Sequence, residues 1–334
     1  MKKKVSVVMC TFNGEKYLKE QIESIINQTY PIYELIIQDD CSTDHTMDIL
    51  LNYEKEHPYI HVFRNETQKG VNQNFFSAIA RATGDCIAIS DQDDIWELDK
   101  IEIQIPYTND YMLVTCISKP FVSDDKVKIN FDERLINFRL ERLIYLNLLS
   151  GHTQLFQKQL LEKIPDLAYW DNCIVYDQAI AIVAAAYNSI IYIPKVLVNH
   201  RRLIHSATYT EPINYEKTLP NIFRFAGRTF LQYYRLRPEI RTYFMQMYCF
   251  LDKINVPQVT KKNAMALAHY QSQNTLSAYI KLTILCVRLR NRIFYAKEKN
   301  AVLSILRAVY FPISSSEYFR FFTPRNKQKN EYIK

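Results

Sequence analysis

The first hundred residues alternate between short strand-like runs and longer amphipathic runs, and no other feature of the sequence restricts the fold as much. The strand-like runs are residues 5–9, 34–38, 60–63 and 86–89. After the first of them, Leu18, Ile22 and Ile25 recur at helical spacing. Strands that alternate with helices in this way predict an α/β fold, with a mostly parallel sheet covered by helices on both faces.

Polar and acidic residues follow three of these strands, at the point where each strand ends. Thr11 and Asn13 follow the first strand, Asp39 and Asp40 the second, and residues 91–94 the fourth. Parallel sheets bind their ligands at the carboxyl ends of the strands, so these side chains are expected to lie close together. Carboxylates gathered at one place repel one another, and the site therefore needs a cation or a proton.

Asp91 and Asp93 lie on the loop after the fourth strand, with one residue between them. Oxygen ligands on a short loop suit Mg²⁺ or Mn²⁺ and leave coordination positions for phosphate oxygens. Such a cation would bridge a substrate diphosphate and take up charge as the diphosphate leaves. An Asp-x-Asp pair alone is common in solvated turns. The interpretation as a metal site therefore depends on the position of this pair directly after the fourth strand.

Four segments in this order resemble the motifs of the family 2 inverting glycosyltransferases. They are Val5–Gly14, Leu35–Asp44, Thr83–Asp85 and Ser90–Trp96. The resemblance is close over residues 4–104 and looser to about residue 210. It implies a GT-A fold for residues 1–210. It also implies transfer of a hexosyl group from a UDP- or dTDP-sugar to a hydroxyl of a glycan or lipid-linked acceptor, in bacterial surface polysaccharide synthesis.

The resemblance also implies roles for the residues at the strand ends. Asp40 would hydrogen-bond the nucleotide base, and Asp91 would lie near the ribose or the sugar. Cys41 stands where the family usually has glycine, which should change the loop geometry slightly. The residues implied for nucleotide-sugar binding are Thr11, Asn13, Glu15, Asp40 and Asp91.

Metal binding is implied for Asp93, together with a basic stretch about a hundred residues downstream. That stretch, residues 199–206, resembles a loop that folds over the diphosphate, and Arg201 or His205 would contact phosphate or metal. A solvated basic loop is the alternative. Asp94 is predicted to cap the following helix.

An inverting transferase needs one general base, which in this family is an aspartate that opens a helix. Asp177 fits this position, before the apolar run 179–186, although an aspartate there is also a plausible helix cap. Asp171 is the fallback, and Gln178 departs from the tryptophan that often follows the base. Gly151 and His152 resemble the acceptor side, where glycine would leave room for a sugar.

The seven cysteines are an odd number, and none belongs to a C-x-x-C pair. This pattern argues against a disulfide framework or a zinc site and fits a reducing cytosol. The basic N-terminus precedes an apolar run too short for a signal peptide, and no run reaches the roughly 18 apolar residues of a membrane span. A cytoplasmic protein is expected.

Residues 211–334 are predicted to form a helical, basic region, because they hold 21 of the 42 Lys and Arg residues but only 7 of the 35 Asp and Glu residues. Within it, residues 276–294 read as an amphipathic helix with basic residues near one face. Such a surface suits peripheral contact with the inner face of the cell membrane, and an ordinary helical appendage is the alternative. No nucleic-acid recognition motif is present, so no nucleic-acid partner is expected.

Two other functions compete with glycosyl transfer. A nucleotidyltransferase would also bind a nucleotide and metal at the strand ends, but it would carry a glycine-rich phosphate loop after the first strand, which residues 11–14 do not form. A membrane-associated scaffold that retains the fold without activity would more often have lost one of Asp91, Asp93 and Asp177.

Overall fold

The computed structural model describes residues 2–123, 127, 129, 131, 136–165, 174–203, 219–294 and 300–322. The chain divides into two compact units. The first comprises residues 1–131 and 149–211, and the second comprises residues 132–148 and 212–334. Residues 132–148 thus leave the first unit and belong with the C-terminal region. The boundary at residue 210, drawn from the sequence, stays a prediction.

The first unit contains eight strands, all in one sheet. The strands are β1 (Val5–Thr11), β2 (Glu34–Asp39), β3 (Ile60–Arg64), β4 (Cys86–Ser90), β5 (Ile95–Trp96), β6 (Leu113–Val122), β7 (Leu155–Gln157) and β8 (Ile190–Arg202). Its α-helices are α1 (Leu18–Ile26), α2 (Thr46–Glu56), α3 (Val71–Ile79), α4 (Lys100–Gln104) and α6 (Tyr176–Ala186).

The strand order is β3-β2-β1-β4-β7-β6-β8-β5. β1 pairs in parallel with β2 and β4, β2 pairs in parallel with β3, and β6 pairs in parallel with β8. β7 is antiparallel to both β4 and β6, and β5 is antiparallel to β8. The sheet is therefore mixed, with its four parallel N-terminal strands at one side.

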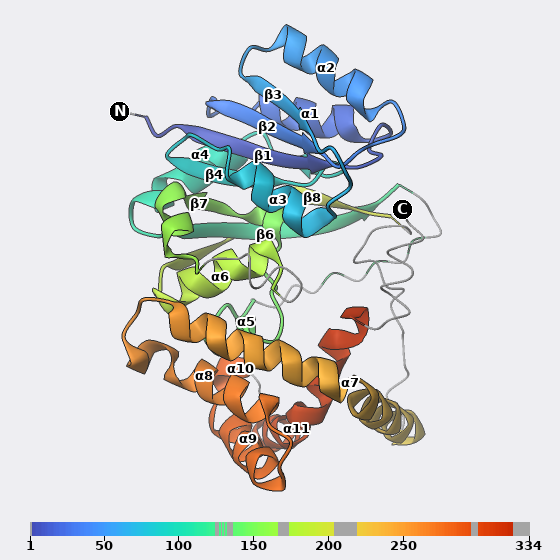
Figure 1. Cartoon of the computed structure of the whole chain (residues 1–334), viewed down its shortest axis with the longest axis vertical. Coiled ribbons are helices and arrows are strands. Elements are labelled where there is room, and N and C mark those ends of the chain that lie inside the picture. The colour runs from blue at the N-terminus through green and yellow to red at the C-terminus, as the bar shows by residue number, and fades with distance from the viewer. Residues whose placement is uncertain are drawn as a thin grey trace. The chain divides into compact units, whose positions relative to one another are not determined.

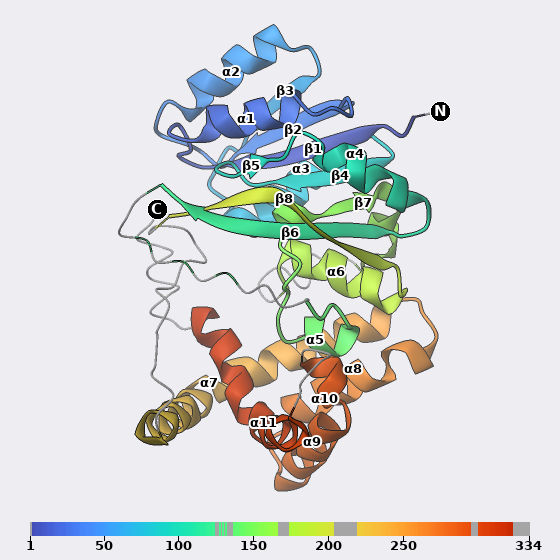
Figure 2. The same ribbon diagram turned by 180° about the vertical axis from the view of Figure 1, so that it is seen from behind.

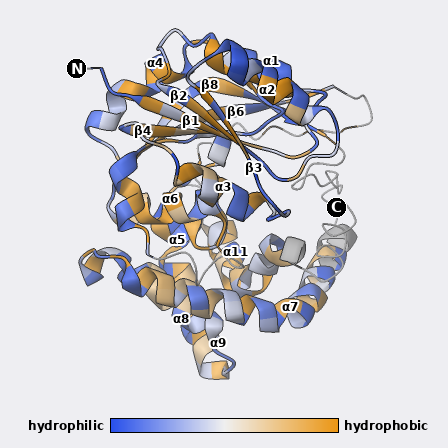
Figure 3. Ribbon diagram, turned by 45° about the horizontal axis from the view of Figure 1, so that its top comes forward, coloured by the Kyte–Doolittle hydropathy of each residue, from blue (hydrophilic) through white to orange (hydrophobic). Residues whose placement is uncertain are grey.

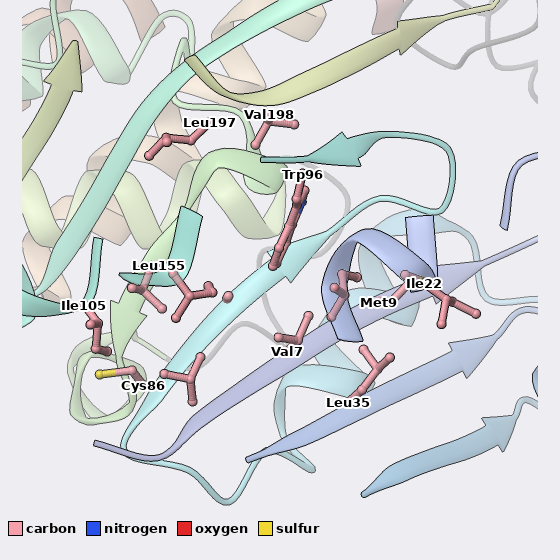
Figure 4. Close-up of a cluster of buried hydrophobic side chains, with 14 of the residues drawn as sticks. Val7, Met9, Ile22, Leu35, Cys86, Trp96, Ile105, Leu155, Leu197 and Val198 are labelled. Carbon is pink, nitrogen blue, oxygen red and sulfur yellow. The ribbon is translucent and has the colours of Figure 1, made fainter. Parts of the chain in front are cut away.

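β1 is buried over its whole length, and its side chains alternate between two apolar layers. Val7 and Met9 join one buried cluster with Ile22 of α1, Leu35 of β2 and Trp96 of β5 (Figure 4). Because both faces of the strand are covered, it shows no alternation of polar and apolar residues in the sequence.

Helices cover both faces of the sheet. α3 lies in front of the sheet in Figure 1, whereas α1 and α4 lie in front of it in the view from behind (Figure 2). Orange, hydrophobic residues run along the strands between these layers (Figure 3). The α/β fold predicted from the alternation of strands and helices is confirmed.

The second unit is helical in the parts that the structure describes. Its α-helices are α5 (Leu140–Leu143), α7 (Leu219–Lys253), α8 (Gln258–Ser272), α9 (Leu276–Arg288), α10 (Arg290–Ile293) and α11 (Ala301–Ser314). α8 packs against α7, and α9 packs against α11. The prediction of one helix over residues 276–294 is wrong, because α9 ends at Arg288 and Leu289 separates it from α10. Among the described residues, no helix is both long enough and apolar enough to cross a membrane.

Candidate active site

The carboxyl ends of β1, β2 and β4 lie beside one another at one edge of the sheet. Thr11 pairs with Asp39 in the register of β1 and β2, and Met9 pairs with Ser90 across β1 and β4. The loops after these three strands are therefore neighbours, as the sequence predicts for parallel strands.

The loop after β1 is tied to the loop after β2 by two of the residues predicted to bind the nucleotide-sugar. Asn13 Oδ1 accepts a hydrogen bond from the backbone N–H of Thr43 at 2.9 Å, and Glu15 Oε2 accepts one from the backbone N–H of His45 at 2.8 Å. The backbone N–H of Glu15 in turn donates to Asp44 Oδ2 at 3.1 Å. These side chains therefore hold the two loops together at the edge of the sheet.

Thr11 is buried and its hydroxyl donates to Asp39 Oδ1 at 3.0 Å. Asp39 Oδ2 also accepts from the backbone N–H of Ser42 at 2.9 Å, which closes the turn after β2. Cys41 within this turn has φ of 66°, in the left-handed region that glycine adopts more readily than other residues. This explains why glycine is the usual residue at this position in the family that the sequence resembles.

Asp40 is 4% exposed, and its carboxylate anchors a third segment of the chain. Its Oδ1 accepts from Asn65 Nδ2 and from the backbone N–H of Lys69, both at 2.7 Å, and its Oδ2 accepts from the backbone N–H of Gly70 at 2.8 Å. A carboxylate has about four acceptor sites, so the three bonds leave about one for a ligand donor.

The loop after β4 is held against the loop after β1 by Gln92, which the sequence analysis passed over. Its Oε1 accepts from the backbone N–H of Phe12 at 2.9 Å, and its Nε2 donates to the carbonyl of Phe12 at 3.0 Å. Gly14 lies against the same side chain, and a β-carbon there would overlap the Gln92 amide. The reciprocal pair fixes the backbone that carries Asp91 and Asp93.

Two carboxylates and two imidazoles converge beside this loop. Asp91, Asp94, His152 and His200 each offer a ligand atom, and these atoms all lie within 4.8 Å of one another. His152 Nδ1 lies 3.0 Å from Asp91 Oδ2 and 3.4 Å from Asp94 Oδ2, and His200 Nδ1 lies 2.9 Å from Asp94 Oδ1. The two rings stack with 4.6 Å between their centroids.

This group is suited to a divalent cation. Asp94 is fully buried, yet its Oδ2 has no hydrogen-bond partner among the described residues. Carboxylate and imidazole ligands together fit Mn²⁺ and other first-row metals better than the all-oxygen set that Mg²⁺ prefers. Four converging ligand atoms and one unsatisfied buried oxygen are features expected of a metal site.

Burial and the neighbouring charges shift the pKa values of the acidic loop and of His152. Burial, reinforced by Asp94 and Asp91, raises the pKa of Asp93 to about 7. Burial opposes a charge on His152, but Asp94 and the hydrogen bond to Asp91 outweigh it and raise the pKa of His152 to about 9. The His152 and His200 rings lower the pKa of Asp94 despite its burial. The site thus holds negative charge that a cation neutralises.

Arg201 braces the acidic loop from β8. Its side chain is 5% exposed, its Nε donates to the Asp93 carbonyl at 2.9 Å, and its backbone N–H donates to Asp94 Oδ1 at 3.0 Å. Its guanidinium also forms an ion pair with Glu20 and lies 4.3 Å from the centroid of the Tyr17 ring. These contacts account for its burial through protein partners, whereas the sequence predicted a contact with phosphate or metal.

Asp177 lies in the first turn of α6, as predicted, and its Oδ2 accepts from the backbone N–H of Gly151 at 3.1 Å. The expectation that Gly151 leaves room for a sugar stays a prediction, and the structure gives a further reason for glycine at this position. A β-carbon at Gly151 would overlap the Tyr176 hydroxyl, so the space is filled by that ring, which stacks on Phe75 with 4.2 Å between centroids. Gly151 therefore allows α6 and its Asp177 to approach the 151–153 turn.

Comparisons with known proteins bear on this arrangement. The model of glycosyl transferase family 2 matches residues 6–165. A putative teichuronic acid biosynthesis glycosyltransferase of Bacillus subtilis (strain 168), TuaG, is 41% identical over 103 residues, which are 31% of this chain and 41% of TuaG. The uncharacterized glycosyltransferase MJ1057 of Methanocaldococcus jannaschii is 30% identical over 195 residues, which are 54% of this chain and 67% of MJ1057. The chain belongs to glycosyltransferase family 2. It spans about two fifths of the length of TuaG.

Two solved structures share the fold of this family 2 chain. The complex of S. aureus TarS with UDP-GlcNAc has a TM-score of 0.56 and 15% sequence identity, and the match covers 98% of this chain and 92% of that one. The mannosyltransferase PcManGT from Pyrobaculum calidifontis, in complex with GDP-Man and Mn²⁺, has a TM-score of 0.53 and 16% identity, with 98% and 88% covered. The GT-A fold with a helical C-terminal region is confirmed.

The metal ligands suggested by the structure differ from those suggested by the family motif. Asp93 is not part of the converging group, and His205 and Asp171 lie outside the described residues. The prediction that Asp94 caps a helix is wrong, because α4 begins at Lys100 with Asp99 as its N-cap residue. Asp94 and His200 are the functional candidates that sequence reasoning missed.

Proposed function

We propose that this family 2 chain is a metal-dependent inverting glycosyltransferase. It transfers one sugar from a UDP- or dTDP-sugar to a hydroxyl of a glycan or lipid-linked acceptor, on the cytoplasmic side of the membrane, in the synthesis of a bacterial surface polysaccharide. The observation that carries the proposal is the convergence at the carboxyl ends of β1, β2 and β4. There Asp91, Asp94 and the rings of His152 and His200 converge, and Asp177 of α6 accepts a hydrogen bond from Gly151, the residue before His152. Asp40 directly follows the neighbouring strand β2.

The donor is held from three loops. Asp40 keeps about one acceptor site for an N–H of the base, and the segment that it anchors at residues 69–70 forms part of the same edge. Asn13 and Glu15 keep the first loop in place beside it, and Asp91 binds the ribose or the sugar. TarS with UDP-GlcNAc and PcManGT with GDP-Man, which share this fold, support a nucleotide-sugar donor.

Asp177 acts as the general base. It accepts the proton of the acceptor hydroxyl while the acceptor oxygen attacks the anomeric carbon, and the bond from that carbon to the diphosphate oxygen breaks. The bond from the Gly151 N–H to Asp177 Oδ2 orients the carboxylate for this transfer. One displacement inverts the configuration at the anomeric carbon.

The negative charge that develops on the departing diphosphate requires a divalent cation, Mg²⁺ or Mn²⁺, which supplies Lewis-acid stabilisation. The residues that would hold it are Asp91, Asp94, His152 and His200, or, as the family motif implies, Asp93 with His205. In the structure both Nδ1 atoms of the first set face carboxylate oxygens and donate to them. For these residues to hold a cation, both Nδ1 protons would have to leave. The Mn²⁺ in the PcManGT complex supports a metal in this fold.

Calorimetric titration of UDP and dTDP, with and without Mn²⁺, tests the donor site and separates the two ligand sets. We expect Mn²⁺-dependent binding that His200→Gln abolishes if the first set holds the metal, and that Asp93→Asn abolishes if the motif set does. Asp99→Asn is the matched control. Asp99 lies on the same stretch of chain, but its Oδ2 forms an ion pair with Lys195 Nζ at 2.7 Å and is not one of the converging ligand atoms. Failure of the folded wild-type protein to bind either nucleotide would overturn the proposal.

Turnover assays test the reaction itself. Asp177→Asn should bind the nucleotide with unchanged affinity and lose about 10²–10⁴-fold in kcat, the usual contribution of a general base. Release of a nucleoside diphosphate indicates glycosyl transfer, whereas release of pyrophosphate would indicate a nucleotidyltransferase. Binding of UDP without turnover on any acceptor of a lipid-linked glycan panel would favour the inactive scaffold.

Peripheral contact with an anionic membrane is proposed for the second unit. α9 exposes Leu276, Ile280 and Ile284 at a spacing of four residues, and 75%, 50% and 63% of these side chains are accessible. α11, which packs beside α9, exposes Val302 and Leu306. Apolar faces with neighbouring basic residues favour an interfacial position. Flotation with phosphatidylglycerol vesicles should recover the wild-type protein and lose Ile284→Ser, and equal flotation of the two would contradict the contact.

A further inference from the structure

The second unit contains a pocket of about 160 Å³, and none of the described residues that line it carries a carboxylate. Two arginines, Arg142 and Arg307, face it together with the hydroxyl-bearing residues Ser314 and Tyr318. Phe294 and Phe311 supply apolar walls. A cavity of about 150 Å³ holds a group the size of benzene, so this pocket admits a small ligand or the head of a larger one.

Arg142 lies in α5 and is 7% exposed. Its Nη1 donates to Tyr318 Oη at 3.0 Å, and the guanidinium carbon lies 5.1 Å from the centroid of the same ring. Its sequence neighbour Glu141 is engaged elsewhere, in an ion pair with Arg292 and a hydrogen bond from Asn263. None of the ion pairs formed by the described residues includes Arg142. Buried charges are normally paired, and the described residues supply no anion for this guanidinium.

The other described residues of the lining supply further donors and carry no negative charge. Arg307 lies on α11 with an exposed side chain, 5.8 Å from the centroid of the Phe294 ring. Tyr318 Oη accepts the hydrogen bond from Arg142, so the hydroxyl hydrogen of Tyr318 points away from Arg142. Ser314 is the last residue of α11 and also lines the pocket. Arginine forks combined with hydroxyl donors are the arrangement that recognises phosphate oxygens.

We propose that this pocket binds a phosphate group, carried by a small phosphomonoester or by a lipid headgroup. The inference does not depend on sugar transfer, because every residue that carries it lies in the second unit. Arg142 supplies a buried guanidinium, Arg307 an exposed one, and Phe294 and Phe311 supply the apolar walls.

Titration with inorganic phosphate at constant ionic strength tests the pocket, with saturating UDP present so that the donor site is occupied. Arg142→Gln and Arg307→Gln should each weaken phosphate binding about tenfold or more, as expected for loss of a charge-assisted hydrogen bond. Arg288→Gln is the matched control, because Arg288 is an exposed arginine of the same unit that does not line the pocket. It should leave the affinity unchanged.

Arg142 is buried, so its replacement can unfold the protein. If the Arg142→Gln variant does not fold, phosphate titration of the Arg307→Gln and Ser314→Ala variants decides the outcome. Absence of saturable phosphate binding by the wild-type protein would overturn the proposal. Equal weakening by Arg307→Gln and Arg288→Gln would also overturn it, because that result reflects general surface charge.

Vesicle flotation then identifies the source of the phosphate. Vesicles of phosphatidylcholine carry either phosphatidic acid or, at equal surface charge, phosphatidylserine. If a lipid headgroup is the ligand, Arg307→Gln reduces flotation with phosphatidic acid only, and inorganic phosphate competes. If a soluble phosphomonoester is the ligand, phosphate binds as above and flotation does not change with Arg307→Gln. Both results retain the phosphate pocket and assign its ligand.

Discussion

Replacing Lys100 by methionine should stabilise the first unit at neutral pH. Lys100 is the first residue of α4 and is fully buried. Its ammonium nitrogen has no hydrogen-bond partner among the described residues and lies 3.9 Å from the centroid of the Trp96 ring. Burial, only partly offset by Cys116, lowers the pKa of Lys100 from 10.5 to about 8. The folded protein thus holds a charge that it solvates poorly.

The magnitude follows from the pKa change. Each pKa unit corresponds to about 1.4 kcal/mol, so burial of the charged form costs about 3 kcal/mol at pH 7. A folded-state pKa reflects every interaction of the charged form, the cation–π contact with Trp96 included, and methionine nearly conserves the volume. The Lys100→Met variant should therefore gain about 3 kcal/mol in free energy of unfolding at pH 7.

The sign of the pH dependence is also determined. Between pH 8 and 10.5 the unfolded lysine binds more protons than the folded one, so wild-type stability rises with pH in this window relative to the variant. The advantage of the variant is constant below pH 8, then shrinks by about 1.4 kcal/mol per pH unit and vanishes near pH 10.5, the pKa of the unfolded lysine.

Differential scanning calorimetry between pH 6.5 and 9.5 measures this difference and separates the transitions of the two units. Lys195→Met is the matched control, since Lys195 is exposed and its ion pair with Asp99 contributes little. It should change the stability by less than about 0.5 kcal/mol at every pH. A Lys100→Met protein that is less stable than the wild type at pH 7, or an advantage that does not shrink above pH 8, would refute the reasoning.

Three further predictions concern the loops of the site. Gly151→Ala should lower kcat/KM for sugar transfer about a hundredfold, because the new methyl group displaces Tyr176. The double variant that also carries Tyr176→Phe should recover part of the activity, and an unchanged kcat/KM of Gly151→Ala would contradict this. Gln92→Ala should weaken UDP binding measured by calorimetry, by about tenfold, because the loop after β4 loses its two hydrogen bonds to the loop after β1. Cys41→Gly should raise the free energy of unfolding in urea by about 1 kcal/mol by removing a side chain from the left-handed region, and a loss of stability would show that the Cys41 thiol contact outweighs the strain.

Local pattern in the sequence was sufficient for the N-terminal half of the first unit. Strand runs such as Val5–Met9, followed by apolar residues at helical spacing, specify their elements through contacts within a few residues. The parallel arrangement then brings Thr11, Asp40 and Asp91 to one edge of the sheet, because parallel strands end on the same side. The motifs between residues 5 and 96, through their resemblance to the family, added the expected GT-A fold and activity.

The reasoning failed where a position depends on residues far apart in the chain. β7 enters the sheet antiparallel between β4 and β6, and no local pattern predicts that place in the strand order. His200 lies 106 residues after Asp94 and meets it only because β8 carries it to the acidic loop. The same contacts bury Asp94. An aspartate that the sequence predicts as a helix cap is therefore a candidate metal ligand in the folded protein.

The sequence alone thus determined which segments of the N-terminal half of the first unit become strands and helices, and that acidic loops meet at the carboxyl ends of parallel strands. Tertiary structure decided which side chains share one site. It filled the space beside Gly151 with Tyr176 and left Arg142 buried without an anion among the described residues. Periodicity and turn residues act over a few positions, whereas burial, charge pairing and the overlap of side chains arise only when distant segments pack together.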